Sequence, residues 1–179
     1  YPYVTSSSSS VGGACTGLGI SPRHIQEIAG VYKAYTTRVG SGPLPTELND
    51  EIGEFIRKRA WEYGTTTGRP RRCGWFDAVA ARYSVTVNGV TSAILTRLDV
   101  LDGISPVRVC VAYRLDGEIV DGFPTSAPVL EACEPVYEDL PGWDKPTASA
   151  RDFADLPQEA ANYVKRLEEL MGCPIDMVS

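Results

Sequence analysis

Four stretches of the chain carry hydrophobic residues in patterns that predict helices. Over residues 46–63 and 155–171 an apolar residue recurs every three or four positions, which is typical of an amphipathic helix with one buried face. Asp155 is the expected N-cap of the second of these helices, and Gly64 and Gly172 are the expected C-terminal stops. Two shorter helices are expected over residues 21–31 and 75–83.

Segments rich in β-branched and aromatic residues separate these helices and predict strands. The clearest strand covers residues 107–113, and Asp116-Gly117 favours a hairpin turn from it into residues 118–120. Further strands are expected over residues 32–39, 93–98, 136–137 and 174–179. Strands that alternate with helices indicate an α/β fold, with a central sheet and flanking helices.

The stretch over residues 6–13 consists only of serine, valine and glycine. We expect it to form a loop. In isolation it would pass for a flexible linker, although its glycines would also let a ligand approach the backbone closely.

The composition indicates a single globular domain over residues 1–179. Hydrophobic residues make up 43% of the chain and charged residues 22%, which is ordinary for a folded protein of this length. The formal net charge of −6 argues against a general nucleic-acid binder or a membrane-surface protein. No apolar stretch is long enough to span a bilayer, and no secretion signal is recognisable.

The five cysteines are widely separated and form no CxxC pair, and His24 is the only histidine. We therefore expect neither a metal site nor a disulfide framework. Isolated cysteines of this kind fit a reducing compartment, and we expect a cytoplasmic protein.

Residues 64–75, GTTTGRPRRCGW, have the composition of an anion-binding loop. Three threonines and a glycine lead into Arg69, Pro70, Arg71 and Arg72. Because Pro70 fixes its own φ and biases Arg69 toward an extended backbone, we expect the guanidinium groups to point in different directions. Guanidinium groups and threonine hydroxyls are good donors for carboxylate or phosphate. A solvated basic loop is the alternative interpretation.

A second candidate site lies at the end of the strand expected over residues 93–98. Arg97 and Asp99 are two positions apart there. An aspartate in this place can accept hydrogen bonds from N1–H and the exocyclic amine of guanine, while the stem of the basic side chain covers the ring. The pair resembles the asparagine-lysine-x-aspartate signature of GTPases, but an aspartate that caps a turn gives the same pattern.

Six blocks of sequence, in order along the chain, resemble adenylosuccinate synthetase. They are YPYVTSS, KAYTTRVGSGPLPTE, GTTTGRPRRCGW, LTRLDVLDG, EPVYEDLPGW and LPQEAANYVKRLEEL, and the resemblance extends over essentially all 179 residues. It implies an α/β fold related to P-loop GTPases and a homodimer. It also implies a reaction that joins IMP to L-aspartate with GTP, forming adenylosuccinate in purine biosynthesis.

The same resemblance implies how the basic loop is used. The loop would close over L-aspartate, so that Thr67 and Arg69 bind its carboxylates, and Arg71 would lie between the aspartate and the nucleotide phosphates. Thr5 would contact the IMP phosphate, and the backbone of Val39 the IMP ribose. The implied contacts to aspartate and IMP are Thr5, Val39, Thr65, Thr66, Thr67, Gly68, Arg69 and Arg71.

The implied contacts to GTP are Arg71, Arg97, Leu98, Asp99 and Ser179. Asp99 would give the preference for guanine, and Ser179 matches the first residue of a further guanine-contacting segment. The commoner family pattern has lysine where Arg97 stands. Because arginine keeps the charge and can stack on guanine, we expect recognition to survive this difference.

Parts of the family's catalytic machinery have no match in this chain. They are an aspartate general base, a histidine general acid, a glycine-rich phosphate loop and the ligands of Mg²⁺, and His24 falls at no catalytic position. Phosphoryl transfer to IMP needs Mg²⁺ and a base. We therefore expect the isolated 179 residues to be inactive. Since the chain begins without methionine and stops on a strand-like segment, we expect it to be the C-terminal portion of a longer enzyme.

Two other functions are compatible with parts of the sequence. One is a stand-alone module that binds a nucleotide or a dicarboxylate without catalysis. The other is RNA binding through the basic residues between Arg57 and Arg72. The acidic net charge argues against RNA binding, and only Trp75 at the edge of the loop could stack on a base.

Overall fold

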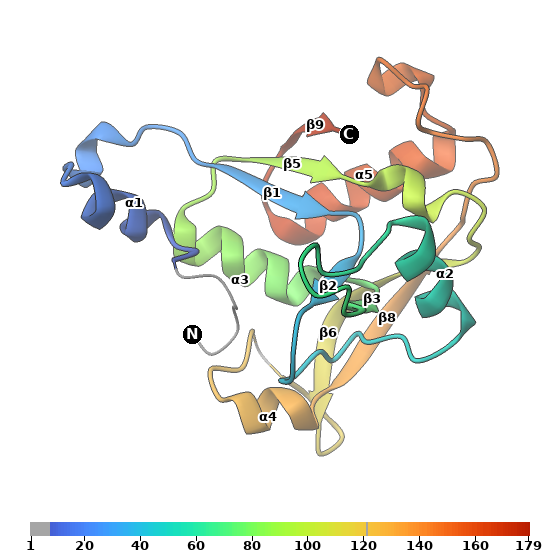
Figure 1. Cartoon of the computed structure of the whole chain (residues 1–179), viewed down its shortest axis with the longest axis horizontal. Helices are drawn as coiled ribbons and strands as arrows, with labels where there is room; N and C mark the ends of the chain where they lie inside the picture. The colour runs from blue at the N-terminus through green and yellow to red at the C-terminus, as the bar shows by residue number, and fades with distance from the viewer. Residues whose placement is uncertain (1–7, 121) are drawn as a thin grey trace.

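The structure is a computed structural model that describes residues 8–120 and 122–179. Its first sheet is parallel and consists of β1 (Ala29–Lys33), β5 (Ser92–Thr96) and β9 (Ile175–Val178), with β5 in the centre. Helices α3 (Ala78–Asn88) and α5 (Gln158–Met171) pack against each other, and α3 lies below this sheet in the view of Figure 1. The chain therefore has the α/β architecture that its alternating pattern predicts.

A second sheet is built around the long strand β6 (Val107–Leu115). The short strand β4 (Phe76–Asp77) runs parallel to β6, whereas β7 (Glu118–Val120) and β8 (Glu134–Leu140) run antiparallel to it. β6 and β7 are joined by the expected turn, in which Asp116 and Gly117 both have positive φ, at 50° and 87°. The hairpin prediction is confirmed.

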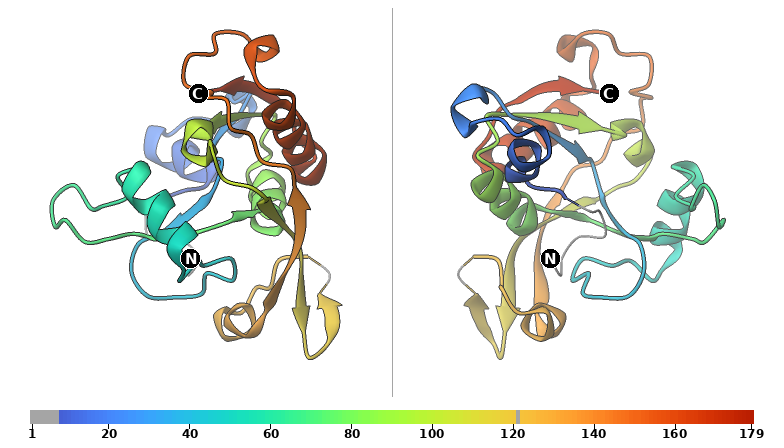
Figure 2. Two further views of the ribbon diagram at one scale, coloured as in Figure 1. Left: turned by 90° about the vertical axis from the view of Figure 1, so that its right-hand side faces the viewer. Right: turned by 60° about the vertical axis from the view of Figure 1, so that its left-hand side comes forward.

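Strands β2 (Thr36–Arg38) and β3 (Arg72–Gly74) form an antiparallel ribbon beside α2 (Glu51–Arg59). Both views in Figure 2 show α2 and the loop that follows it projecting from the side of the molecule. The short helix α4 (Ala127–Ala132) lies near the β6–β7 hairpin. This arrangement places the candidate loop at the edge of the fold, supported by a ribbon and a helix.

A buried carboxylate fixes the connections beyond the carboxyl end of β5. Asp102 accepts hydrogen bonds from Trp143 Nε1 at 2.6 Å and from Thr147 Oγ1 at 2.8 Å, and Arg59 Nη2 lies 3.5 Å from it. These contacts join the short 3₁₀ helix η2 (Leu98–Leu101), the segment before α5, and α2. The segment that carries Arg97 and Asp99 is thereby attached to the core.

Two expectations for the N-terminal part are wrong. The small-residue stretch runs into a helix, α1 (Val11–Leu18), where the Val11 amide donates to Asn88 Oδ1 at 3.0 Å. The helix expected over residues 21–31 is reduced to a single 3₁₀ turn, η1 (Pro22–His24), and residues 29–31 belong to β1 instead. Parallel pairing with β5 outweighs the helical spacing in this segment.

The strand expected over residues 32–39 is divided between β1 and β2. Ala34 and Tyr35 interrupt it, and their side chains are only 0% and 2% exposed. Burial of these two residues turns the chain from one sheet into the other, which a reading of strand propensity alone does not reveal.

The helix expected over residues 46–63 is shorter at both ends. It begins after Asp50, whose carboxylate accepts a hydrogen bond from the Gly53 amide at 2.9 Å, and Ala60 rather than Gly64 is its C-cap. The preceding residues form a turn and then pair with β3, as in the bond from the Leu48 amide to the Cys73 carbonyl. Backbone pairing therefore overrides the helical periodicity at the N-terminal end.

Two other helices start later than expected. α3 begins at Ala78 because Asp77 belongs to β4 and caps the helix, accepting a hydrogen bond from the Ala80 amide. Asp155 lies in a separate 3₁₀ turn, η3 (Phe153–Asp155), and Pro157 is the N-cap of α5. Gly172 ends α5 in the left-handed conformation, as predicted.

Within the described ranges, no helix is long and apolar enough to cross a membrane.

Asp77 gives a test of this architecture, since its carboxylate is 6% exposed and bonds both the Ala80 amide at 3.0 Å and the Tyr113 hydroxyl at 2.5 Å. We predict that Asp77→Ala lowers the free energy of unfolding by about 2–3 kcal/mol, because it removes a helix cap and leaves a buried hydroxyl unpaired. Asp77→Asn, which keeps polar partners for both groups, should cost about 1 kcal/mol or less. Urea unfolding monitored by circular dichroism measures both variants, and equal losses would contradict the assignment.

Candidate functional site

The basic loop is closed at its base by main-chain hydrogen bonds. Tyr63 and Pro70 form an antiparallel bridge, and the Gly64 amide donates to the Arg69 carbonyl at 2.8 Å. Gly68 has φ of 64°, a left-handed conformation that glycine adopts without strain, and its amide closes an inner turn onto the Gly64 carbonyl. The tip of the loop, residues 65–69, is exposed, whereas its stem is fixed.

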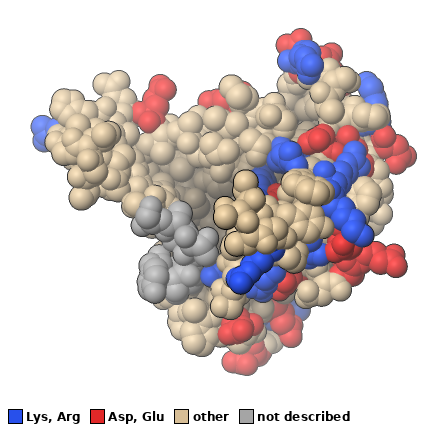
Figure 3. Space-filling view, in the orientation of Figure 1, with Lys and Arg blue, Asp and Glu red and all other residues tan. Residues whose placement is uncertain are grey.

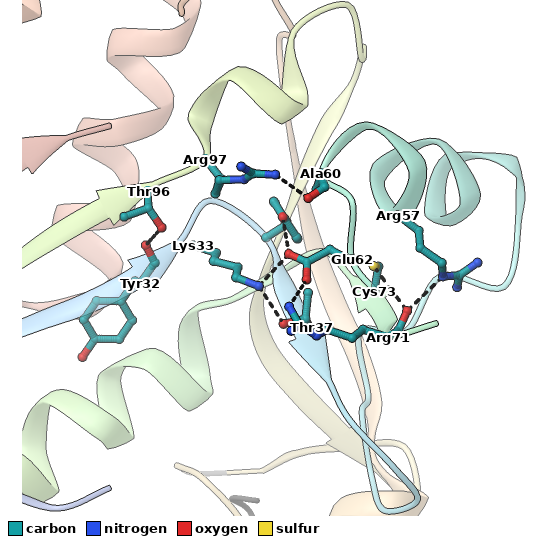
Figure 4. A network of polar contacts seen from close by, with 11 residues as sticks. Tyr32, Lys33, Thr37, Arg57, Ala60, Glu62, Arg71, Cys73, Thr96 and Arg97 are labelled. Carbon is teal, nitrogen blue, oxygen red and sulfur yellow. Dashed lines mark hydrogen bonds and ion pairs between the residues drawn. The ribbon is translucent and has the colours of Figure 1, made fainter. Parts of the chain in front are cut away.

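A buried carboxylate, Glu62, lies at the stem of this loop and is 3% exposed. Lys33 Nζ and the Tyr35 hydroxyl each donate to its Oε1 at 2.6 Å, and Arg71 Nη1 donates to its Oε2 at 2.7 Å. Figure 4 shows Lys33, from the end of β1, and Arg71, from the loop, both pointing toward Glu62. Burial alone would raise the pKa of Glu62, but the hydrogen bonds from Lys33, Tyr35 and Arg71 outweigh it and hold this pKa below its usual value.

The three arginines of the loop have three different environments. Arg71 pairs with Glu62, whereas Arg72 pairs with Glu47 and donates to the Gly42 carbonyl at 2.7 Å. Arg69 is exposed, and the part of the chain that the structure describes offers no partner to its guanidinium. The divergent orientation predicted from Pro70 is consistent with these separate partners.

A cleft of about 700 Å³ lies between the β2–β3 ribbon and α3. Val39 and Arg71 both line it, together with Thr36, Thr37 and Asp77. In the space-filling view of Figure 3, Lys and Arg side chains gather, among acidic ones, over the side that holds α2, whereas the surface over α1 carries few charges. The structure therefore brings two sequence-predicted residues, Val39 and Arg71, to one hollow.

The second candidate segment lies at the carboxyl end of the parallel sheet. Arg97 follows β5 in the left-handed conformation, with φ of 65°, and Asp99 lies half-buried in η2. The Leu98 side chain is buried, and the Leu98 amide lies 3.4 Å from the Ser179 carbonyl that follows β9. Arg97, Leu98, Asp99 and Ser179, predicted together from the sequence, are thus neighbours in space.

The two candidate segments are linked directly. A guanidinium nitrogen of Arg97 donates to the carbonyl of Ala60, two residues before Glu62 (Figure 4). Lys33 ends β1, so the carboxyl ends of β1, β5 and β9 all deliver residues to this region. Ligands of α/β proteins commonly bind at the carboxyl ends of parallel strands. Thr5 lies outside the described residues.

The family model of adenylosuccinate synthetase matches residues 1–179. The chain belongs to this family. The resemblance drawn from the sequence blocks is thereby confirmed.

Curated adenylosuccinate synthetases match the chain along its length. The enzyme of Geobacter sulfurreducens is 58% identical over 179 residues, covering 100% of this chain and 41% of the relative. The enzyme of Carboxydothermus hydrogenoformans is 56% identical over 179 residues, covering 100% of this chain and 42% of the relative. The chain therefore spans about two-fifths of the length of the curated relatives it matches.

A solved structure, described as fully ligated adenylosuccinate synthetase from Plasmodium falciparum, has the same fold. It superimposes with a TM-score of 0.95 at 40% identity, covering 100% of this chain and 43% of that one. The expected adenylosuccinate synthetase fold is therefore confirmed for this portion.

The described part of this adenylosuccinate synthetase chain contains no group of three or more His, Cys, Asp or Glu side chains that could hold a metal ion. The carboxylates nearest the candidate loop, Glu62 and Glu47, are instead paired with basic side chains.

Three residues of the site were missed from the sequence: Lys33, Tyr35 and Glu62. Each lies in a segment interpreted only as a strand or a helix, and the three are separated by up to 29 positions. The one local signal was Glu62, which comes two residues before Gly64 of the candidate loop. Their convergence depends on the pairing of β1 with β5 and of β2 with β3.

Proposed function

We propose that this chain is the part of an adenylosuccinate synthetase that binds L-aspartate and recognises the guanine of GTP. The complete enzyme joins IMP to L-aspartate with GTP, forming adenylosuccinate in purine biosynthesis. The observation that carries the proposal is the loop itself, whose stem is fixed by Glu62 while Arg69 and the threonines at its tip stay exposed. Because the chain belongs to the adenylosuccinate synthetase family, we assign L-aspartate as the ligand of this loop.

The exposed tip suits a small dicarboxylate. Thr65, Thr66 and Thr67 supply hydroxyl donors and Arg69 a guanidinium fork, all within one short turn closed by Gly68. Thr67 and Arg69 would bind the carboxylates of L-aspartate. Because main-chain hydrogen bonds hold the stem, the tip of the loop can close over the substrate while the stem keeps its conformation.

The cleft beside the loop suits the nucleotide that is to be aminated. The backbone of Val39 would meet the IMP ribose, Arg69 would also lie near the ribose, and Thr5 would contact the IMP phosphate. Arg71 lines the cleft and belongs to the loop, which supports a place between aspartate and the nucleotide phosphates.

Guanine recognition would use the segment after β5. Asp99 would accept hydrogen bonds from N1–H and the exocyclic amine of guanine, with Arg97 stacked on the ring. Leu98 can contribute only through its backbone because its side chain is buried, and Ser179 lies beside it. This closeness of Leu98 and Ser179 supports one continuous contact surface for the base.

The remaining parts of the reaction belong to the rest of the enzyme. Mg²⁺ would neutralise the γ-phosphate of GTP during phosphoryl transfer to IMP. The metal ligands, the phosphate loop and the acid and base would come from outside these residues. We further propose that the complete enzyme is cytoplasmic and forms a homodimer. Light scattering of the purified protein would test the dimer.

The central test is the formation of adenylosuccinate, followed by ultraviolet absorbance. We predict activity from the complete protein that contains this chain and none from the 179 residues alone, because the base and the metal site are needed for the first step. A complete protein that binds nucleotide or dicarboxylate but forms no adenylosuccinate would favour a binding module instead. Turnover by the 179 residues alone would refute the division of roles.

For the loop, we predict that Arg69→Leu in the complete enzyme raises the KM for L-aspartate far more than the KM for GTP. Loss of a charge-assisted contact of this kind costs on the order of 2–3 kcal/mol, or roughly a hundredfold. Steady-state kinetics with each substrate varied in turn measure the effect. Arg114→Leu, at an exposed position on β6, is the matched control. Equal effects of Arg69→Leu on both substrates would contradict the assigned role.

For the guanine segment, we predict that Asp99→Asn weakens the preference for GTP over other nucleoside triphosphates, because the amide no longer offers two acceptors to N1–H and the amine. The measurement is kcat/KM for GTP, ITP and ATP. Asp116→Asn is the control, since asparagine also tolerates the positive φ of the hairpin turn. An unchanged preference in Asp99→Asn would remove the guanine assignment.

A further inference from the structure

The contacts of Glu62 come from separate segments of the chain and use both carboxylate oxygens. Oε1 accepts from Lys33 and Tyr35, and Oε2 accepts from Arg71 (Figure 4). A carboxylate buried to this extent is stable only when it is paired and hydrogen-bonded. The position of the Arg71 side chain is therefore tied to that of two residues beyond the loop.

The main chain of the stem has supports of its own. The Arg71 amide donates to the Glu62 carbonyl, and Arg57 Nε donates to the Arg71 carbonyl, both at 2.9 Å. These bonds do not involve the Glu62 carboxylate. Loss of the carboxylate alone would therefore free the Arg71 side chain, while these main-chain hydrogen bonds keep the backbone of the loop in place.

The cluster carries two positive charges, on Lys33 and Arg71, against the single negative charge of Glu62. Arg71 uses Nη1 for this pair, and its other guanidinium N–H groups have no hydrogen-bond partner among residues 8–120 and 122–179. Arg71 also lines the cleft of about 700 Å³. An arginine that is held on one side and unpaired on the other is suited to bind an anion in that cleft.

We propose that Glu62 is a positioning residue that holds Arg71 in the orientation needed to bind an anionic substrate in the cleft. This inference rests on the proposed function. Glu62 does not touch the substrate. It restricts the rotamers of Arg71 before the substrate arrives, so that less conformational entropy is lost on binding. The Arg97 guanidinium donates to the carbonyl of Ala60, two residues before Glu62. The guanine segment and Arg71 are therefore both attached to residues 60–62.

A double-mutant cycle in the complete enzyme tests this role with Glu62→Gln, Arg71→Gln and the double variant. Residues that act as a unit are non-additive, and coupling between contacting groups corresponds to about tenfold in kcat/KM. We expect Glu62→Gln to lower kcat/KM for IMP, the anion assigned to the cleft, about tenfold at saturating GTP and L-aspartate. In the Arg71→Gln background the same change should have an effect below about twofold. An additive cycle, or an unchanged kcat/KM in Glu62→Gln, would overturn the proposal.

The pair Glu138 and Arg166 provides a matched control. Arg166 Nη2 donates to Glu138 Oε2 at 2.8 Å, and neither residue belongs to the loop. Glu138→Gln should leave kcat/KM unchanged. If Glu62→Gln fails to fold, Tyr35→Phe removes one of the three donors and takes its place in the cycle. The expected loss is then smaller, about threefold, and again absent in the Arg71→Gln background. Additive losses would overturn the role here too.

The two proposals fail in different ways. If the unmodified complete enzyme forms no adenylosuccinate, the proposed function fails. If it is active and the Glu62–Arg71 cycle is additive, only the positioning role fails. A thermal melt of each variant separates lost activity from lost folding.

Discussion

The Glu62 carboxylate is the contact on which the arrangement of the candidate site depends. Removing a carboxylate from water is costly, and here three donors offset that cost: Lys33, Tyr35 and Arg71. The hydrogen bonds hold its pKa below the usual value despite burial, so the group is ionised at neutral pH. Because the donors come from the end of β1, the segment after it and the basic loop, these segments can meet in only a narrow range of geometries.

The parallel sheet places the Glu62 contact at the carboxyl ends of its strands. β1, β5 and β9 run in the same direction, so Lys33, Arg97 and Ser179 emerge at one edge. The β2–β3 ribbon then carries Arg71 and Arg72 to the same side, where Arg72 is neutralised by Glu47 and Arg71 is shared between Glu62 and the cleft. An acidic chain thus keeps a local positive region, made by pairing some arginines internally and leaving Arg69 exposed.

Much of the fold follows from local patterns. The apolar stripe of α5, the alternation of β6 and the Asp116-Gly117 turn are all recognisable within short windows, and the structure confirms them. The errors occur where backbone pairing competes with helical spacing. Residues 29–33 pair with β5 instead of continuing a helix, and the residues before Asp50 pair with β3. Such pairing joins positions far apart in the sequence, so no local window contains it.

The sequence by itself determined the family, the α/β class and the residues that carry charge and hydroxyl groups in the loop and after β5. These depend on residue identity and spacing within short blocks. Only the tertiary structure decided that Val39 and Arg71 line one cleft, that Leu98 lies beside Ser179, and that Lys33, Tyr35 and Glu62 join the loop. The reason is physical: a buried carboxylate requires partners, and which side chains supply them is set by strand pairing over long separations in the chain.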